Sequence, residues 1–407
     1  MNLLSLPGIP NIHSHSFQRA MAGLAERGSD RADSFWTWRE LMYRFAGRLT
    51  PESLHDISAQ LFVEMLEAGY TSSCEFHYLH HQAGGRQYDN PAAMSEAIIA
   101  AARETGIRLT LLPVLYMTGG FDGRELSDRQ KRFGHDVDAY LALLDGLMVH
   151  EGPMLRVGVA LHSLRAVPAD AMREVLAAAQ VGAGRPIHIH VAEQAAEVEE
   201  CVAIRGARPV QWLLGNAAVD EAWTLVHATH LVDSELAGIA ASKAVVALCP
   251  STEANLGDGV FPLRDFIARG GRIGIGSDSN VSVSPVEELR WLEYGQRLRS
   301  QQRNIAATRE LPSSGESLLM RCVAGGRQSN GHASQDEDLI GLDENSAALC
   351  GVSARDLHDR FVFAGNRTQV RDVHVQGKCV VQAGRHAKAE PILKRFRDSM
   401  RGLLADA

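Results

Sequence analysis

Residues 186–203 read Pro-Ile-His-Ile-His-Val-Ala-Glu-Gln-Ala-Ala-Glu-Val-Glu-Glu-Cys-Val-Ala, and this stretch indicates how the chain folds. Its first part, 186–191, is a short apolar, β-branched run, which is typical of a parallel strand buried on both faces. Its second part, 193–203, has the alanine-rich spacing of a helix. Together the two parts predict a βα unit, with His190 and Glu193 standing where the strand ends.

The same unit recurs along the chain. Seven more apolar runs predict strands at 8–13, 71–77, 107–116, 155–162, 223–227, 244–249 and 272–278. Helical patterns follow them, for example at 56–67, 91–103, 168–179, 234–241 and 285–298. Eight strands that alternate with helices predict an α/β protein with a (β/α)8 TIM-like barrel, in which functional groups lie at the carboxyl ends of the strands.

The pattern loosens beyond residue 300. One helix is predicted at 316–324, and residues 370–384 alternate in the manner of two strands joined by a Gly-Lys turn. A last helix is predicted at 389–404. We therefore expect a barrel unit over 8–364, a residual small β domain over 1–7 and 365–388, and a C-terminal helix over 389–407.

Charge and composition exclude several classes of partner. The net charge of −8 is spread along the chain, without the basic run that a nucleic acid or a membrane surface requires. No stretch approaches the roughly 20 apolar residues of a membrane span, and the first residues lack the pattern of a signal peptide. Six scattered cysteines without CxxC spacing indicate reduced thiols. These features predict a soluble, cytoplasmic protein that binds neither nucleic acid nor membrane.

Polar residues stand at the ends of six predicted strands. They are His13, His77, His162, His190, His227 and Asp278. A single histidine at such a place is more simply a core or loop residue. Five histidines and one aspartate at six strand ends predict instead a shared site at the mouth of the barrel.

The first strand ends on two imidazoles, His13 and His15. The pleat turns residues two apart to the same side, so these rings can hold one ion. Together with His190 and Asp278 they supply the nitrogen and carboxylate donors of a catalytic zinc site, which keeps one position open for water. We therefore expect His13, His15, His190 and Asp278 to be the metal ligands.

Alternatives to this ligand set remain within the sequence. His188 can replace His190, although Glu193 follows His190 at a spacing that suits a general acid or base. The histidines of residues 77–81 can also bind an ion, but solvated or supporting histidines explain that run more simply. Because the third and fourth predicted strands contain no lysine to bridge two metals, one metal ion is the simpler expectation.

Longer runs of the chain resemble one family. They include His13-Ser-His-Ser-Phe-Gln-Arg-Ala-Met-Ala-Gly-Leu-Ala-Glu26, Ser34-Phe-Trp-Thr-Trp-Arg-Glu-Leu-Met-Tyr43, Glu75-Phe-His-Tyr-Leu-His-His81, Cys249-Pro-Ser-Thr-Glu-Ala-Asn-Leu-Gly-Asp-Gly259 and Gly276-Ser-Asp-Ser279. These runs closely resemble the formimidoylglutamate deiminases, a family of the amidohydrolase superfamily that acts in bacterial histidine degradation. The similarity extends from about residue 7 to residue 298 and resumes near the C-terminus.

The resemblance implies a zinc-dependent hydrolysis of N-formimino-L-glutamate to N-formyl-L-glutamate and ammonia, with one zinc ion per chain. It implies the ligand set given above, with Glu193, His227 and Asp278 as catalytic residues. It also implies a substrate pocket, which is lined by Gln18, Arg39, Tyr78, His162 and Arg165. The substrate is a dicarboxylate, and arginine forks are natural receptors for carboxylates, although an arbitrary arginine more often forms a surface ion pair. By analogy with related barrels we expect a homodimer.

Two features depart from the family pattern. Family members begin with strands that precede the barrel and pair with C-terminal strands, whereas here the first predicted ligand is already residue 13. The strand pair within 370–384 is therefore expected to lack partners and to expose unpaired edges. Where the family pattern reads Ser-Asp-Ser-His, this chain has Asn280, which can form hydrogen bonds but cannot carry a proton.

Two other functions fit the same residues. A related aminohydrolase that acts on a guanidine or purine-like substrate would use the same metal chemistry, but a neutral heterocycle would not require Arg39 and Arg165. An inactive, metal-binding remnant of the family would keep the barrel and release no ammonia. Zinc content measured together with ammonia release distinguishes these functions.

Overall fold

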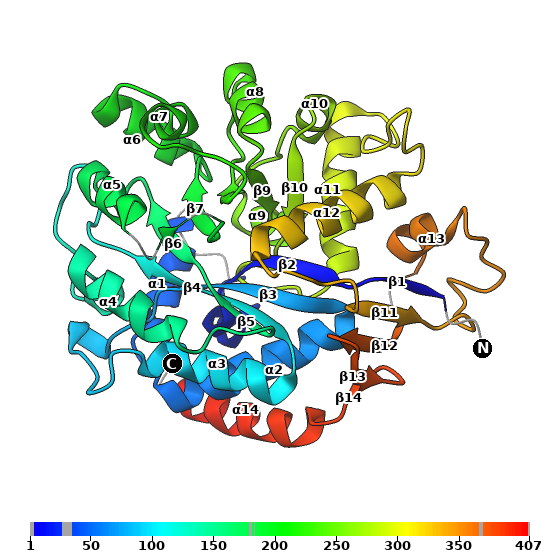
Figure 1. Cartoon of the computed structure of the whole chain (residues 1–407), viewed down its shortest axis with the longest axis horizontal. Coiled ribbons are helices and arrows are strands. Elements are labelled where there is room, and N and C mark those ends of the chain that lie inside the picture. Colours follow the sequence, from blue (N-terminus) through cyan, green and yellow to red (C-terminus); the bar gives the residue numbers. More distant parts are fainter. Residues whose placement is uncertain (1–3, 27–34, 179–180, 183, 366–368, 406–407) are drawn as a thin grey trace.

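A computed structural model of the chain describes residues 4–26, 35–178, 181–182, 184–365 and 369–405. Its centre is a closed barrel of parallel strands in which β2 pairs with both β3 and β10 (Figure 1). The barrel strands are β2 (Ile9–Ser14), β3 (Tyr70–His77), β4 (Arg108–Leu115), β5 (Leu155–Val157), β6 (Val159–Ser163), β7 (Ile187–Val191), β8 (Trp223–His227), β9 (Val245–Leu248) and β10 (Arg272–Ile275). The predicted (β/α)8 barrel is thereby confirmed.

The fourth predicted strand is divided in two. β5 pairs with the first half of β4, and β6 pairs with the end of β4 and with β7. The break falls at Gly158, where a Cβ atom would lie 2.5 Å from Leu112 Cδ2 and 2.9 Å from the carbonyl oxygen of Pro186. Only glycine fits at this close approach, so the strand bends there without leaving the barrel.

Helices surround the barrel and fill the intervals between its strands (Figure 1). They are α1 (Phe35–Ala46), α2 (Pro51–Ala68), α3 (Ala93–Thr105), α4 (Val137–Met148), α5 (Ala169–Ala177), α6 (Ala195–Arg205), α7 (Pro209–Asn216), α8 (Asp233–Ser242), α9 (Pro250–Leu256), α10 (Leu263–Ala268), α11 (Pro285–Ser300), α12 (Ser314–Asn330), α13 (Leu357–Phe363) and α14 (Ala389–Leu404), with 3-10 turns η1 (Ser16–Met21), η2 (Ala83–Gly85) and η3 (Lys131–Phe133). The helix predicted at 168–179 ends at 177, and residue 179 lies outside the described part. No helix among the described residues is long and apolar enough to cross a membrane.

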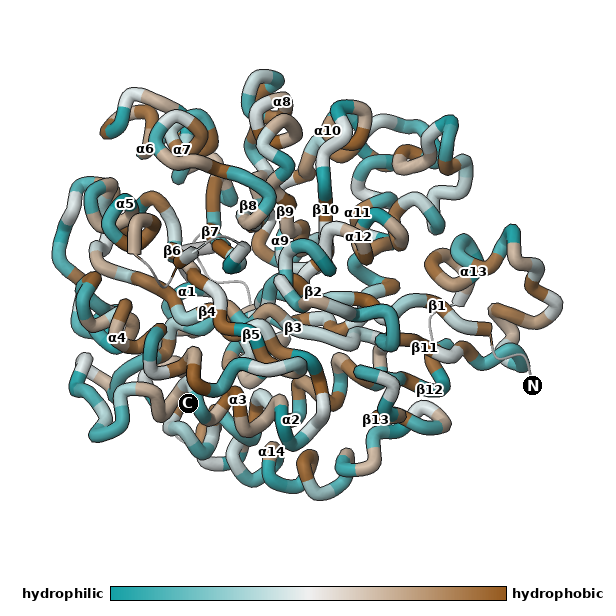
Figure 2. Tube along the Cα trace, in the orientation of Figure 1, coloured by the Kyte–Doolittle hydropathy of each residue, from teal (hydrophilic) through white to brown (hydrophobic). Residues whose placement is uncertain are grey.

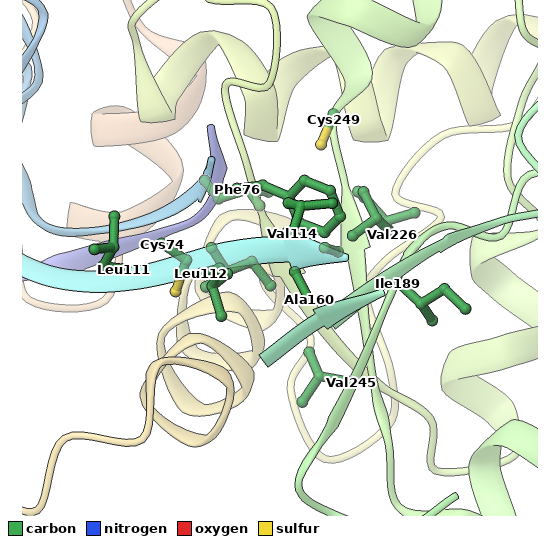
Figure 3. Packing of buried hydrophobic residues seen from close by; sticks show 14 of the residues in the cluster. Cys74, Phe76, Leu111, Leu112, Val114, Ala160, Ile189, Val226, Val245 and Cys249 are labelled. Carbon is green, nitrogen blue, oxygen red and sulfur yellow. The ribbon is translucent and has the colours of Figure 1, made fainter. Parts of the chain in front are cut away.

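The core lies in and around the barrel wall. Buried side chains from successive strands, such as Phe76, Leu112, Val114 and Val226, pack together there (Figure 3). Hydrophilic residues are frequent on the outer helices, for example along α14 (Figure 2). The barrel strands are therefore buried on both faces, as the near-continuous hydrophobic runs predict.

A second, antiparallel sheet lies beside the barrel. Its order is β1 (Ser5–Pro7), β11 (Leu339–Leu342), β12 (Val370–Val375), β13 (Lys378–Gln382) and β14 (Arg385–His386). The expectation that the strand pair within 370–384 lacks partners is therefore wrong, because β12 pairs with β11 on one side and β13 on the other. The turn between β12 and β13 is Gln376-Gly377, and Lys378 already belongs to β13. Residues 339–342, expected within the barrel unit, belong to this sheet.

A buried ion pair joins the two sheets. Arg108 on β4 donates from Nε and Nη2 to the two carboxylate oxygens of Asp338, at 2.9 Å and 2.8 Å. Asp338 Oδ1 also accepts from the backbone N–H of Gln376, at 2.7 Å. A bidentate pair with a further hydrogen bond fixes the small sheet against the end of the barrel opposite to the site.

Candidate active site

The four predicted metal ligands come together at the carboxyl ends of the barrel strands. His13 lies on β2 and His15 directly follows it, His190 lies on β7, and Asp278 follows β10. The Nε2 atoms of His13 and His190 are 3.0 Å apart. Asp278 Oδ1 lies 3.5 Å from His13 Nε2 and 3.4 Å from His15 Nε2. All four side chains are buried, so their donor atoms converge away from bulk water.

The geometry fits a zinc ion. Ligands at about 2.0–2.1 Å in a tetrahedron are about 3.3 Å from one another, and the pairs His13–His190, His13–Asp278 and His15–Asp278 are 3.0 Å, 3.5 Å and 3.4 Å apart. His15 Nδ1 lies 2.8 Å from the carbonyl oxygen of Phe76, and His190 Nδ1 lies 2.9 Å from that of His162. An Nδ1–H that donates to a carbonyl leaves Nε2 unprotonated and free to bind a metal. Burial lowers the pKa of His13 to about 3, so this ring is also neutral, as a metal ligand must be.

Several residues of the site have a left-handed backbone, with φ of +66° at His227, +46° at Asp278 and +56° at Asn280. Such angles cost about 1 kcal/mol or more outside glycine. Asn280 supports the strained turn, because its Nδ2 donates to the carbonyl oxygens of His15 at 3.0 Å and Asp278 at 2.9 Å. Its Oδ1 accepts from Ser277 Oγ at 2.6 Å. The asparagine therefore positions the backbone of two ligands through its amide.

His227 at the end of β8 is surrounded by carboxylates. Its Nε2 lies 3.7 Å from Asp278 Oδ2 and 3.8 Å from Glu193 Oε1, and its Nδ1 lies 3.3 Å from Glu253 Oε1. Burial alone lowers the pKa of His227, but Glu193 and the other carboxylates outweigh it and raise that pKa well above its ordinary value. Burial raises the pKa of Glu193 to about 7. The pair can therefore hold and move protons near neutral pH.

Glu253 is a member of this group to which the sequence assigned no role. It lies on α9, and its Oε1 also accepts from the backbone N–H of Cys249 at 2.9 Å. The thiol of Cys249 stays protonated, because burial raises its pKa well above the ordinary value. Glu253 follows the seventh predicted strand by four residues. A search for polar residues at strand ends would find it if it also covered the first turn of the following helix.

The residues expected to bind substrate share a single pocket with the metal cluster and the proton-handling pair. That pocket is lined, among others, by His15, Gln18, Arg39, Tyr43, Tyr78, Tyr116, His162, Arg165, His190, Glu193, His227 and Asp278. Gln18 Nε2 donates to the hydroxyl of Tyr78 at 2.8 Å. Burial lowers the pKa of His162 well below its ordinary value, and the charges of Arg165 and Arg39 lower it further. The pocket therefore joins a neutral His162 and two guanidinium groups to the metal cluster.

The remaining histidines of the sequence prediction lie elsewhere. His77 ends β3 as predicted, but it joins neither the group of converging metal donors nor the lining of this pocket. Its ring lies 5.3 Å from that of His80, and His135 lies 4.5 Å from His80 and 4.7 Å from His81. The Nε2 atoms of His80 and His81 contact the carbonyl oxygens of residues 114 and 134, at 3.0 Å and 2.7 Å. Among the described residues this group forms no set of converging metal donors.

His188, the alternative ligand, is buried deeper in the barrel. Its Nε2 lies 3.2 Å from the carbonyl oxygen of Ser329 on α12. Among the described residues His188 joins no converging donor group, whereas His190 does. The strand therefore presents two histidines on one face, and the depth of each ring decides which one faces the cluster.

The sequence profile of the amidohydrolase family matches residues 4–309. This chain belongs to the amidohydrolase family. Formimidoylglutamate deiminase from Pseudomonas aeruginosa is 52% identical over 398 residues, which are 96% of this amidohydrolase and 87% of that protein. A 5-methylthioadenosine/S-adenosylhomocysteine deaminase from Natronomonas pharaonis is 26% identical over 388 residues, or 93% and 81% of the two chains. The amidohydrolase is therefore a hydrolase that acts on carbon–nitrogen bonds.

Solved structures give the same result. The crystal structure of an amidohydrolase from Brucella melitensis has a TM-score of 0.93 and 44% identity, covering 98% of this chain and 90% of that one. An adenosine deaminase from Xanthomonas campestris with bound zinc has a TM-score of 0.80 at 20% identity, covering 99% and 87%. The second comparison shows the fold alone. Members of the family generally bind a metal. The histidine-rich cluster of this chain is the corresponding candidate metal site.

Proposed function

We propose that the protein hydrolyses N-formimino-L-glutamate to N-formyl-L-glutamate and ammonia. The observation that carries the proposal is one pocket in which a three-histidine, one-aspartate cluster stands beside Glu193 and His227 and shares its lining with two arginines. The cluster suits hydrolysis of an amidine carbon, and the arginines suit a substrate with two carboxylates. The 52% identity to a formimidoylglutamate deiminase supports the same substrate.

We propose one zinc ion per chain, held by His13, His15, His190 and Asp278. When bound, zinc would lower the pKa of a coordinated water toward about 7 and so would supply a nucleophile for an amidine carbon at neutral pH. The four residues account for a single ion, because no lysine stands on β4 to β6 to bridge a second one. Zinc content per chain in purified protein tests the stoichiometry.

Three side chains move or balance protons in this proposal. Asp278 Oδ2 accepts the proton of the attacking water, and its distance of 3.7 Å to His227 Nε2 places it beside a cationic partner. His227 stabilises the tetrahedral intermediate by donating from Nε2 to the oxygen on the attacked carbon. Glu193, whose pKa is raised to about 7 by burial, donates a proton to the departing nitrogen, so ammonia leaves in place of an amide anion.

Substrate recognition rests on the other wall of the pocket. We propose that Arg39 on α1 and Arg165 after β6 bind the two carboxylates, and that Gln18, Tyr78 and His162 position the formimino group. The ring of Arg39's helical neighbour Tyr43 lies 5.5 Å from the Arg39 guanidinium carbon, which holds that arginine over the pocket wall. A guanidinium fork matches a carboxylate in two parallel hydrogen bonds.

An ammonia-release assay tests the function. Zinc-loaded protein is assayed with N-formimino-L-glutamate, with an arginine side-chain analogue and with adenosine. We expect release of ammonia from the first substrate alone. Preference for the guanidine or the purine would establish a related aminohydrolase, and a protein that binds zinc but releases no ammonia from any of them would be an inactive remnant.

We further propose a cytoplasmic homodimer. Trp291, Tyr294 and Leu298 follow one another along α11 and are 45%, 38% and 77% exposed, next to a groove that contains Phe361 and Val370. An exposed apolar strip of this kind marks a contact surface. Light scattering after gel filtration gives the oligomeric state, and Leu298→Glu is expected to shift a dimer toward the monomer.

A further inference from the structure

Three tyrosines line the pocket, and their hydroxyl groups differ in one respect. The Tyr78 oxygen accepts from Gln18 Nε2 at 2.8 Å, and the Tyr116 oxygen accepts from Gln130 Nε2 at 2.9 Å. The Tyr43 ring is buried, and its hydroxyl forms no hydrogen bond among the described residues; unlike the enclosed hydroxyl of Tyr70, this oxygen stays accessible from the pocket. A tyrosine whose ring is buried usually gives its O–H a hydrogen-bond partner. The pocket side is where Tyr43 can find a partner.

The surroundings of Tyr43 indicate what that partner is. Tyr43 lies on α1 one turn after Arg39, whose guanidinium carbon is 5.5 Å from the centre of the phenol ring. Its ring stacks on Phe133, with centres 6.1 Å apart and planes 20° apart. The charges of both Arg39 and Arg165 act on the phenol oxygen. A hydrogen-bond acceptor that enters between two guanidinium groups is expected to be an anion.

The phenol of Tyr43 is protonated and can act as a hydrogen-bond donor. Burial raises the pKa of Tyr43 to about 12, with Tyr116 acting in the same direction and Arg39 and Arg165 opposing it. The group therefore keeps its proton at neutral pH and can donate to a carboxylate.

We propose that the hydroxyl of Tyr43 donates a hydrogen bond to one of the two carboxylates of the substrate, beside Arg39 and Arg165, and so selects for dicarboxylates. This assignment rests on the proposed function for the identity of the substrate. It adds a binding residue that the sequence did not single out. The stacking on Phe133 holds the ring in place, so the hydroxyl is aimed before the substrate arrives.

Tyr43→Phe removes the hydroxyl and keeps the ring that stacks on Phe133. Calorimetric titration with the product N-formyl-L-glutamate measures binding without turnover. We expect the affinity of the variant to fall about 10-fold, because a hydrogen bond to a charged group is lost. In steady-state assays KM for formiminoglutamate should rise by a similar factor while kcat changes less than about twofold. Tyr88→Phe, which removes a phenol oxygen outside this pocket, is the matched control and should change neither quantity.

Two analogues locate the carboxylate. N-formyl-4-aminobutanoate lacks the α-carboxylate of the product, and N-formyl-L-glutamine has an amide in place of the γ-carboxylate. The difference in affinity between wild type and Tyr43→Phe should persist for one analogue and disappear for the other. Unchanged affinity of Tyr43→Phe for N-formyl-L-glutamate, or an equal loss for both analogues, would overturn the assignment. If wild type binds the product but releases no ammonia from formiminoglutamate, the proposed function fails while the binding test of Tyr43 still stands.

Discussion

The molecule contains two groups of buried histidines, and only one of them is built to hold a metal. In the first group the ring nitrogens of His13, His15 and His190 lie close to one another, and Asp278 faces the Nε2 atoms of His13 and His15. The second group consists of His77, His80, His81 and His135, and its charged neighbour is the buried Arg132. Arg132 adds to the effect of burial in lowering the pKa of His77 to about 3.

The difference between the groups lies in their counter-charges and in the nitrogen that each ring leaves free. Around the first group, the carboxylate of Asp278 faces the rings of His13 and His15, and the rings of His15 and His190 are anchored through Nδ1. In the second group His80 and His81 are anchored through Nε2, and the carboxylate of Asp136 acts on His135 without offsetting the effect of burial on its pKa. Burial makes imidazoles neutral in both places, but only convergent lone pairs with a carboxylate make a metal site.

The largest expected effect comes from removing the carboxylate that joins the first group. Asp278→Asn keeps the size of the side chain and removes the charge, so we expect zinc content to fall to less than about a tenth of the wild-type value and turnover to fall at least about 1,000-fold. His80→Asn in the second group is the control and should leave zinc content unchanged. Full zinc content in Asp278→Asn would show that the ligand assignment is wrong.

The next effect separates proton transfer from metal binding. Glu193→Gln should keep the zinc and lose about 100-fold in kcat, because the amide cannot donate a proton to the departing nitrogen. Zinc analysis and kcat are measured on the same preparation. A variant with wild-type kcat would remove Glu193 from the mechanism.

A smaller effect on kcat is expected for Glu253, whose carboxylate acts on the reaction through His227. Glu253→Leu leaves His227 Nδ1 and the N–H of Cys249 without their acceptor, and we expect kcat to fall about 10-fold with little change in KM. Glu253→Gln keeps an oxygen at that place and should recover most of the loss if orientation is what matters. Equal losses in both variants would show that the charge of Glu253 is required.

The smallest expected effect concerns the second histidine group and changes the free energy of unfolding. Burial lowers the pKa of His135 to about 4, below the value of 6.5 in the unfolded chain. Between these values the unfolded chain binds more protons, so the free energy of unfolding falls as the pH falls from 6.5 toward 4, by at most about 1.4 kcal/mol per pH unit for one histidine. His135→Gln should therefore make the melting temperature of the metal-free protein less dependent on pH in that window, with kcat at pH 7.5 unchanged. An identical pH dependence in both proteins would mean that His135 is accessible to protons in the fold.

Much of the architecture followed from local patterns. The predicted strand at 223–227 matches β8, and the last helix matches α14. The ends of strands pointed to His13, His190, His227 and Asp278 because a closed parallel barrel brings all carboxyl ends to one mouth. The same rule also selected His77, whose ring lies beside His80 and outside the metal donors, because the end of a strand does not say how deep a ring lies or toward which side it turns.

The sequence by itself determined the alternation of strands and helices and the residue types available at the strand ends, because these depend on short-range periodicity and on the side-chain chemistry of single residues. Only the tertiary structure decided which imidazole nitrogens converge, that β11 gives the C-terminal strands a partner, and that Tyr43 faces the pocket from α1. These outcomes depend on closure of the barrel and on contacts between segments far apart in the chain. Asn280 shows the same division: its amide is visible in the sequence, whereas the carbonyl group of His15 becomes its partner only after β2 and β10 have paired.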